Sequence, residues 1–225
     1  MKYIYIHTYS MNSSFNQDIT VFNEVIGFKD KFKINCIVET GTYTGTTTKV
    51  LAENFNDVHS IEINVHLHNN VKNNLNNYKN LHLHLGSSQD VLEKILPEIS
   101  KKYKNVIFYL DAHWNNYWPI NDEIKTIGKY LHNRAIIIID DFEVPNRKHK
   151  YDTYDNNKLN YDYIQDALDE CYSDYIHYYL NNTTQIRSLT NTGKIYILPK
   201  SILNDYGINQ NMLCYSENNT LYSNQ

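Results

Sequence analysis

The sequence lacks the features of membrane, secreted and disulfide-rich proteins. Its longest fully apolar run, residues 135–139, is far shorter than the roughly 20 residues that a membrane-spanning helix needs. The first residues do not contain the long apolar stretch of a signal peptide. The three cysteines, Cys36, Cys171 and Cys214, are an odd number without a CxxC pair, which indicates neither a disulfide framework nor a zinc knuckle. We therefore expect a cytoplasmic (intracellular) protein with no membrane partner.

The chain also has no surplus of positive charge and little glycine or proline. Its 225 residues contain 21 Lys and Arg against 25 Asp and Glu, a formal net charge of -4. Because nucleic-acid-binding domains normally carry a basic face, we expect no nucleic acid partner. With 7 glycines and 4 prolines, no flexible linker divides the chain. We predict one domain over residues 1–225, with a core at about 34–200, a short N-terminal helix at 18–29 and a C-terminal tail.

What the chain has in excess is asparagine, with 32 residues, and tyrosine, with 21. Both share AT-rich codons with lysine and isoleucine, so we attribute the excess to base composition. Short β-branched runs alternate with longer amphipathic stretches, which is typical of a parallel sheet with crossover helices. We predict strands at 34–39, 58–62, 81–85, 106–111, 135–140, 175–180 and 194–198. We predict helices at 18–29, 45–54, 65–77, 88–100, 119–132 and 160–172.

The order of these elements predicts an α/β fold. Five parallel strands with helices on both faces come first, and no helix lies between the last two runs, so these should form an antiparallel terminal pair. Residues 142–159 form a long connection of the kind that often serves as a lid or substrate loop. Its basic run at 147–150 is expected to be solvated. The alternating pair His82 and His84 has no partner at a known metal spacing, and we expect ordinary surface or partly buried roles for both.

A glycine-containing loop follows the first strand, in the segment Glu39-Thr-Gly41-Thr-Tyr43-Thr-Gly45. Glycine lets the backbone turn tightly and approach a ligand, and the helix that follows offers free N–H groups. The dinucleotide pattern GxGxxG is not matched. Glu62 ends the second strand about 20 residues further on, where a carboxylate can accept hydrogen bonds from both ribose hydroxyls. Together the loop and Glu62 predict a nucleoside pocket.

Polar residues also end the next three strands. Ser88 and Gln89 follow the third strand and suit either an adenine edge or a helix cap. Asp111, Asp140 and Asp141 end the fourth and fifth strands, so they should meet at one edge of the sheet. Three carboxylates there would repel one another unless a cation lies between them. Oxygen ligands suit Mg²⁺, and the alternative is that these aspartates cap helices.

Five stretches in this order resemble the metal-dependent class I O-methyltransferases, with catechol O-methyltransferase as the nearest pattern: residues 39–45, 61–64, 86–90, 110–114 and 139–141. The resemblance implies a Rossmann-like class I methyltransferase sheet and S-adenosylmethionine as methyl donor. The cofactor-binding residues that it implies are Glu39, Gly41, Tyr43, Gly45, Thr47, Glu62, Ser88, Gln89 and Asp111. The residues that it implies for Mg²⁺ (or Mn²⁺) are Asp111, Asp140 and Asp141, where the family usually has Asp-Asn in place of the last two.

The chain departs from the catechol enzymes after Asp111. Ala112 stands between this aspartate and His113, and the segment from Trp114 to Trp118 contains no lysine where those enzymes carry their base. Sugar O-methyltransferases of the broader class use a histidine base, so we assign catalysis to His113 and Asp111. The predicted acceptor is a vicinal diol on a sugar or glycan. The alternatives are a catechol-like small molecule, a non-catalytic nucleoside-binding protein and a nicotinamide-dependent oxidoreductase, and an oligomer is possible.

Overall fold

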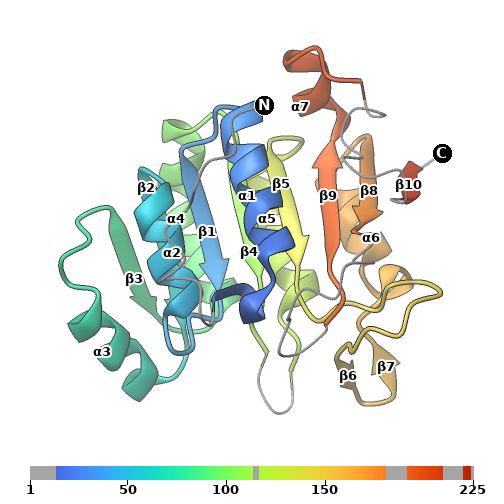
Figure 1. The fold of residues 1–225 in the computed structure, drawn as a ribbon. Helices are drawn as coiled ribbons and strands as arrows, with labels where there is room; N and C mark the ends of the chain where they lie inside the picture. The colour runs from blue at the N-terminus through green and yellow to red at the C-terminus, as the bar shows by residue number, and fades with distance from the viewer. Residues whose placement is uncertain (1–13, 114–116, 181–191, 210–219, 224–225) are drawn as a thin grey trace.

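A computed structural model describes residues 14–113, 117–180, 192–209 and 220–223 (Figure 1). Its centre is an eight-stranded sheet in the order β10-β8-β9-β5-β4-β1-β2-β3. The strands are β1 (Cys36–Thr40), β2 (Asp57–Glu62), β3 (Leu81–Leu85), β4 (Val106–Leu110), β5 (Ala135–Ile139), β8 (Tyr175–Tyr179), β9 (Ile195–Pro199) and β10 (Thr220–Ser223). A separate hairpin is formed by β6 (Thr153–Tyr154) and β7 (Asn157–Lys158).

The topology confirms the predicted fold class. Strands β3, β2, β1, β4 and β5 are parallel to one another, and β9 runs antiparallel between β5 and β8. The last strand, β10, pairs antiparallel with β8 and was not predicted. The hairpin β6–β7 was also not predicted, and it lies within the connection that was expected to be one long loop.

Helices cover both faces of the sheet. They are α1 (Ile19–Lys31), α2 (Thr46–Asn54), α3 (Val65–Asn74), α4 (Ser88–Lys102), α5 (Ile120–Leu131), α6 (Tyr161–Cys171) and α7 (Lys200–Asp205), with a 3₁₀ turn η1 at Ser14–Gln17. Asp18, Asn64 and Asn160 cap α1, α3 and α6 because their side chains accept backbone N–H groups in the first turn. Ser87 precedes α4, but its hydroxyl donates to Asp90 Oδ2 at 2.6 Å instead of capping the backbone.

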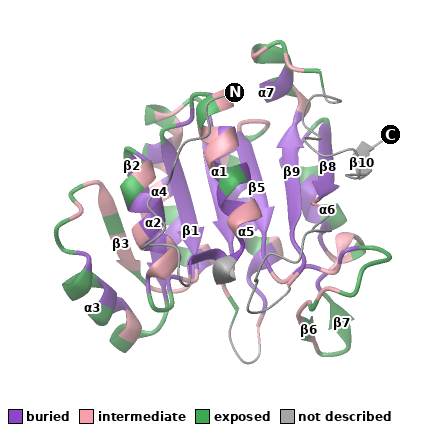
Figure 2. Cartoon of the chain, viewed as in Figure 1, coloured by how far each residue is buried: buried purple, intermediate pink, exposed green. Residues whose placement is uncertain are grey.

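Two apolar layers hold the helices to the sheet. In β4, Phe108 faces the layer shared with α4, α5 and α6, whereas Ile107 faces the layer shared with α1 and α2. Strands β1, β4 and β5 are buried along their whole length (Figure 2), which explains why β4 and β5 are continuous apolar runs without alternation. The edge strand β3 is the exception, because each of its residues is only partly buried or exposed.

The parallel strands bring their carboxyl ends to one edge of the sheet, drawn at the bottom of Figure 1. The long connection after β5 folds back against this edge, because Asp152 N–H donates to the Asp141 carbonyl at 2.8 Å and Glu143 N–H donates to the Leu159 carbonyl at 2.7 Å. Cys36 and Cys171 are buried free thiols, and Cys214 lies outside the described residues. Across the part of the chain that the structure describes, none of the helices combines the length and hydrophobicity needed to cross a bilayer.

Candidate active site

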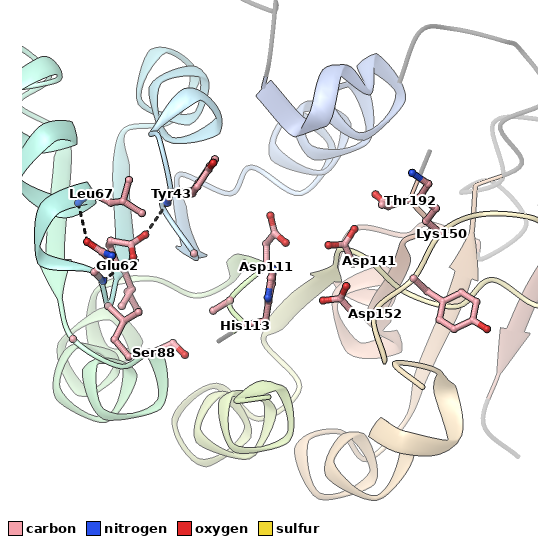
Figure 3. A pocket seen from close by; sticks show the side chains of 17 residues that line it. Tyr43, Glu62, Leu67, Ser88, Asp111, His113, Asp141, Lys150, Asp152 and Thr192 are labelled. Carbon is pink, nitrogen blue, oxygen red and sulfur yellow. Dashed lines mark hydrogen bonds between the residues drawn. The ribbon is translucent and has the colours of Figure 1, made fainter. Parts of the chain in front are cut away.

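A cavity of about 790 Å³ opens at the carboxyl ends of the parallel strands (Figure 3). Its volume is in the range of small-molecule and cofactor sites. The polar and charged side chains in its wall come from the loops after β1 to β5 and from the segment before β9: Tyr43, Glu62, Asn64, Ser88, Asp111, His113, Asp141, Lys150, Tyr151, Asp152 and Thr192. Figure 3 shows Glu62 and Tyr43 at one end, Asp141 and Asp152 at the other, and Asp111 and His113 between them.

The glycine loop requires glycine at two positions. Gly41 and Gly45 have φ angles of +85° and +78°, a region that favours glycine because a side chain would clash with the backbone. A Cβ atom on Gly41 would lie 2.5 Å from the carbonyl oxygen of Asp111, and one on Gly45 would lie 2.8 Å from the side chain of Val71. The loop therefore packs directly against the end of β4, which brings the first and fourth strand ends to one wall of the cavity.

Glu62 is fixed in place by the backbone on both sides. Its Oε2 accepts the N–H of Tyr43 at 2.8 Å, and its Oε1 accepts the N–H of Asn64 at 2.8 Å. The side chain is buried, yet it lines the cavity. Because each carboxylate oxygen can accept more than one hydrogen bond, Glu62 can hold the glycine loop and still accept two hydroxyl groups of a ligand.

The cavity wall includes most, but not all, of the predicted site residues. Gly41, Tyr43, Glu62, Ser88, Asp111, His113 and Asp141 line it. Glu39, Gly45, Thr47, Gln89 and Asp140 are described by the structure but do not line it. Thr47 Oγ1 accepts the N–H of Phe15 at 3.0 Å, and Gln89 Oε1 is buried away from solvent. Their direct contact with a cofactor therefore stays a prediction, because none of them is part of the cavity wall.

Glu39 lies beneath the glycine loop, where it accepts hydrogen bonds from the hydroxyls of Thr48 and Ser60, both at 2.6 Å. Burial raises the pKa of Glu39 from its ordinary value near 4.5 to about 7, although the two hydroxyl donors lower it and the charge of Glu62 raises it further. The carboxyl group therefore binds a proton in the folded protein over a pH range in which it is ionised in the unfolded chain.

This shift predicts a pH-dependent effect of Glu39→Gln on stability. Between about pH 4.5 and 7 the folded parent binds the proton that the unfolded chain has lost, so the parent loses stability as the pH rises, by on the order of 3 kcal/mol in total. Glutamine does not titrate. We expect urea unfolding to show that the free energy of unfolding of the variant, relative to that of the parent, rises by this amount between pH 4.5 and 8. Glu98→Gln, at a side chain that is 79% exposed, is the control, and an equal shift in both variants would contradict the assignment.

Asp140 is bound on both carboxylate oxygens by groups of the protein itself. Lys194 Nζ lies 2.8 Å from Asp140 Oδ1, and the two side chains are 4% and 0% exposed. Oδ1 also accepts from the N–H of Asp141 at 2.7 Å and from the hydroxyl of Thr192 at 3.0 Å, and Oδ2 accepts from the hydroxyl of Tyr109. Burial alone would raise the pKa of Asp140, but the Lys194 ammonium and these donors hold it below its ordinary value.

The other acidic groups of this edge face the cavity without such a partner. Burial, followed by the negative charges of Asp140 and Asp141, raises the pKa of Asp111 well above its ordinary value. Burial and the neighbouring Asp140 and Asp152 likewise raise the pKa of Asp141 to about 6. Asp141 has a φ angle of +50°, an uncommon conformation for a non-glycine residue, and its Oδ1 atom is buried with no hydrogen bond to any residue that the structure describes.

His113, Asp141 and Asp152 form a group that could hold a metal ion, because their ligand atoms lie within 4.8 Å of one another. Beside them is a small cavity of about 20 Å³, whose wall also includes Asp111. Such a volume has room for about one water-sized sphere. The small cavity is therefore lined by all three carboxylates predicted for the metal, Asp111, Asp140 and Asp141, together with Asp152. Asp140 is in addition paired with Lys194.

Asp152 and Lys194 are the residues that sequence reasoning missed. Asp152 lies in the middle of the long connection, and only the tertiary hydrogen bond to the Asp141 carbonyl returns it to the strand ends. Lys194 precedes β9. This strand was predicted to pair with β8, but its position next to β5 was not predicted. A lone lysine before an apolar strand was the available signal for a buried cation. Trp114, which belongs to the motif after Asp111, lies outside the described residues.

Comparison with known proteins gives similarity at the level of structure. No protein-family model matches the chain, and no curated protein matches it by sequence. A solved O-methyltransferase from Bacillus cereus in complex with SAH (S-adenosylhomocysteine) has a TM-score of 0.54 at 16% identity, covering 84% of each chain. The O-methyltransferase TomG from Streptomyces achromogenes, solved with SAM (S-adenosylmethionine), has a TM-score of 0.53 at 15% identity, covering 80% of this chain and 79% of that one.

Spermidine synthase from Thermotoga maritima is also similar, with a TM-score of 0.50 at 9% identity over 84% of this chain and 63% of that one. The shared architecture shows that the chain has the same Rossmann-like fold as these proteins, which is the fold that the resemblance of its five sequence stretches implied. Because one fold hosts different chemistries, the activity must be argued from the residues of the site.

Proposed function

We propose that this protein is an S-adenosylmethionine-dependent O-methyltransferase whose acceptor is a vicinal diol on a sugar or glycan. The observation that carries the proposal is the division of one cavity into two ends, with Asp111 and His113 between them. The end with Glu62 and the glycine loop suits a nucleoside, because a buried carboxylate and a close backbone can recognise ribose hydroxyls. The acidic end suits the hydroxyl groups of an acceptor.

The acidic end also fits a divalent metal ion. Asp141 contributes a buried oxygen that no described residue hydrogen-bonds, Asp152 lies beside it, and Asp111 lines the same small cavity. Oxygen donors of this kind suit Mg²⁺ or Mn²⁺, so Asp111, Asp141 and Asp152 are the residues that would hold the ion. When bound, such an ion would polarise the acceptor hydroxyl and stabilise the negative charge that develops on its oxygen.

The protein's own groups would position and deprotonate the acceptor. His113 is exposed at the centre of the cavity wall and would take the proton of the acceptor hydroxyl. The alkoxide oxygen would then attack the methyl carbon of the sulfonium in line, forming the C–O bond as the C–S bond breaks and leaving S-adenosylhomocysteine. The cavity would hold both reactants near contact distance, which lowers the entropic part of the activation barrier. Lys150 at the rim provides a cation for an acceptor that carries negative charge.

Specific residues separate this proposal from its alternatives. A nicotinamide-dependent oxidoreductase would bind its dinucleotide at a GxGxxG loop. Counted from Gly41, Tyr43 and Thr46 stand where the second and third glycines of that pattern would be. A catechol enzyme of the resembling family would carry a lysine shortly after the His-Trp pair, and the segment has none. A nucleoside-binding protein without catalysis has no need of the carboxylates gathered opposite Glu62.

The proposal predicts that methyl transfer stops when divalent metal is removed. The protein incubated with S-adenosylmethionine and a panel of sugars, nucleotide sugars and catechols should form a methylated sugar, detected by mass spectrometry. EDTA should abolish the product and excess Mg²⁺ should restore it. Asp152→Asn keeps the side-chain shape but removes a charged ligand, so it should raise the Mg²⁺ concentration for half-maximal rate at least tenfold. Asp155→Asn, in the neighbouring β6–β7 turn, is the control. Full activity in EDTA would contradict the metal-dependent mechanism.

A further inference from the structure

A second cluster of metal-ligating side chains lies at the opposite, amino-terminal end of the same sheet. Cys36 begins β1, Asp57 and His59 lie on β2, and His82 and His84 lie on the edge strand β3. Cys36 is paired in register with Asp57, and His59 with His82. Side chains two residues apart on a strand point to the same face, so these residues share the face that α4 covers. None of them lines the cavity of the candidate active site.

The ligand atoms of this cluster converge on one oxygen. Oδ1 of Asp57 lies 3.4 Å from Nε2 of His59 and 3.1 Å from Nε2 of His82. Cys36, Asp57 and His59 each offer a ligand atom, and these atoms lie within 4.8 Å of one another. In a tetrahedral site with bonds of about 2.0–2.3 Å, neighbouring ligand atoms are about 3.3–3.7 Å apart. The two distances from Asp57 Oδ1 to the histidine nitrogens are close to that spacing without an ion.

Hydrogen bonds in the cluster leave the converging atoms available. The Asp57 side chain is only 6% exposed. Its Oδ2 accepts from Lys102 Nζ at 2.7 Å and from the Tyr103 hydroxyl at 2.5 Å, whereas its Oδ1 is buried and makes no hydrogen bond within the described residues. Nδ1 of His59 lies 3.0 Å from Nε2 of His84, so the other ring nitrogen of His59 is left to face Asp57.

We propose that Cys36, Asp57, His59 and His82 form a structural site for a borderline-soft divalent transition metal of the Zn²⁺ class. One thiolate, one carboxylate and two imidazoles are the donors that Zn²⁺ takes in four-coordinate sites closed by protein ligands. This donor set differs from the oxygen-rich end of the active-site cavity, which suits Mg²⁺. His84 is a positioning residue, because its hydrogen bond to His59 Nδ1 fixes the orientation of the imidazole that binds.

The metal would attach an edge strand to the centre of the sheet. Strand β3 lies at the edge, and none of its residues is fully buried. An ion bound by β1, β2 and β3 cross-links this strand to the buried centre. The carboxyl end of β3 leads into Gly86 and Ser88 in the wall of the active-site cavity, so the cross-link also holds that wall. Lys102 is the competing cation at Asp57, and its side chain is 64% exposed, so it can turn into solvent when the metal binds.

Cobalt substitution tests this site with a readout that is independent of methyl transfer. The full-length protein, stripped with a chelator, should bind Co²⁺ with a thiolate charge-transfer band in the near ultraviolet and the strong visible bands of tetrahedral geometry, and Zn²⁺ should displace it. Cys36→Ser should remove the ultraviolet band, whereas Cys171→Ser, at a second buried thiol, should keep it. Zn²⁺ at about 100 times its dissociation constant should lower the unfolding equilibrium constant about 100-fold.

Histidine variants locate the ion. His82 is half-exposed, so His82→Ala should fold normally by circular dichroism and bind Co²⁺ at least tenfold more weakly, as should His59→Ala. His84→Ala should weaken binding by about 10–100-fold, the range for loss of an orienting partner. His66→Ala, at an exposed histidine on α3, should leave the spectrum unchanged. Weak octahedral bands without charge transfer, or unchanged binding in both His59→Ala and His82→Ala, would overturn the site.

Discussion

Replacing Lys194 by methionine is expected to lower the free energy of unfolding by about 3–5 kcal/mol, the range for breaking one side of a buried ion pair. The substitution leaves the Asp140 carboxylate buried at the end of β5 with no cation beside it, since both side chains are almost fully excluded from solvent. Methionine has a similar length, so lost packing contributes little. Urea denaturation of the parent and the variant at one pH measures the difference.

A double variant separates the charge from the packing. Asp140→Asn removes the charge that Lys194→Met leaves unpaired, so the two substitutions together should restore most of the lost stability, and the coupling between them should exceed 2 kcal/mol. As a matched control, Lys104→Met breaks the ion pair with Asp205, which is largely exposed and should contribute about 1 kcal/mol or less. A loss below 1 kcal/mol in Lys194→Met would show that the buried pair is not what holds Asp140.

The second large effect is expected for His113→Ala, which should lower turnover by about 10²–10⁴-fold, the range for loss of a general base. The affinity for S-adenosylhomocysteine should change little, because the nucleoside end of the cavity is formed by Glu62 and the glycine loop. Single-turnover rates with a methyl-accepting sugar, together with calorimetry of product binding, measure the two quantities separately.

Excess Mg²⁺ distinguishes the two roles open to His113, whose ring also lies within reach of Asp141 and Asp152. If the imidazole is the base, raising the Mg²⁺ concentration should not restore the rate of the variant, whereas added imidazole should restore part of it. Recovery with Mg²⁺ alone would assign His113 to the metal instead. His132→Ala, at a histidine that bonds Ser173 far from the cavity, is the control and should keep the parent rate.

The fold was predictable because most of its strands are buried on both faces. Ala135 to Ile139 and Val106 to Leu110 are continuous apolar runs for that reason, and their spacing left room for one helix between successive strands. The short strand β10 and the hairpin β6–β7 have no such run. Their pairing depends on contacts made only after the chain has folded, so the sequence pattern did not indicate them.

The site was predictable where a residue lies at the end of a parallel strand. Glu62 and Asp111 line the cavity for that reason. The burial of Glu39 beneath the glycine loop could not be inferred from its position in the sequence. Glu39 directly precedes the loop, but its side chain accepts hydrogen bonds from Thr48 and Ser60. Asp140 and Asp141 are neighbours in sequence and line the same small cavity. The ion pair of Asp140 with Lys194 could not be inferred, because Lys194 is 54 residues away in the chain.

The most direct test of the central claim is calorimetric titration of the protein with S-adenosylhomocysteine, and separately with NAD. The account predicts one bound S-adenosylhomocysteine per chain and no heat from NAD. In Glu62→Ala, the affinity for S-adenosylhomocysteine should fall by about 1.5–3 kcal/mol, because the ribose hydroxyls lose a charged acceptor. Glu53→Ala, on α2 and outside the cavity wall, should bind as the parent does. Binding of NAD, or equal affinity of the parent and Glu62→Ala for S-adenosylhomocysteine, would contradict the account.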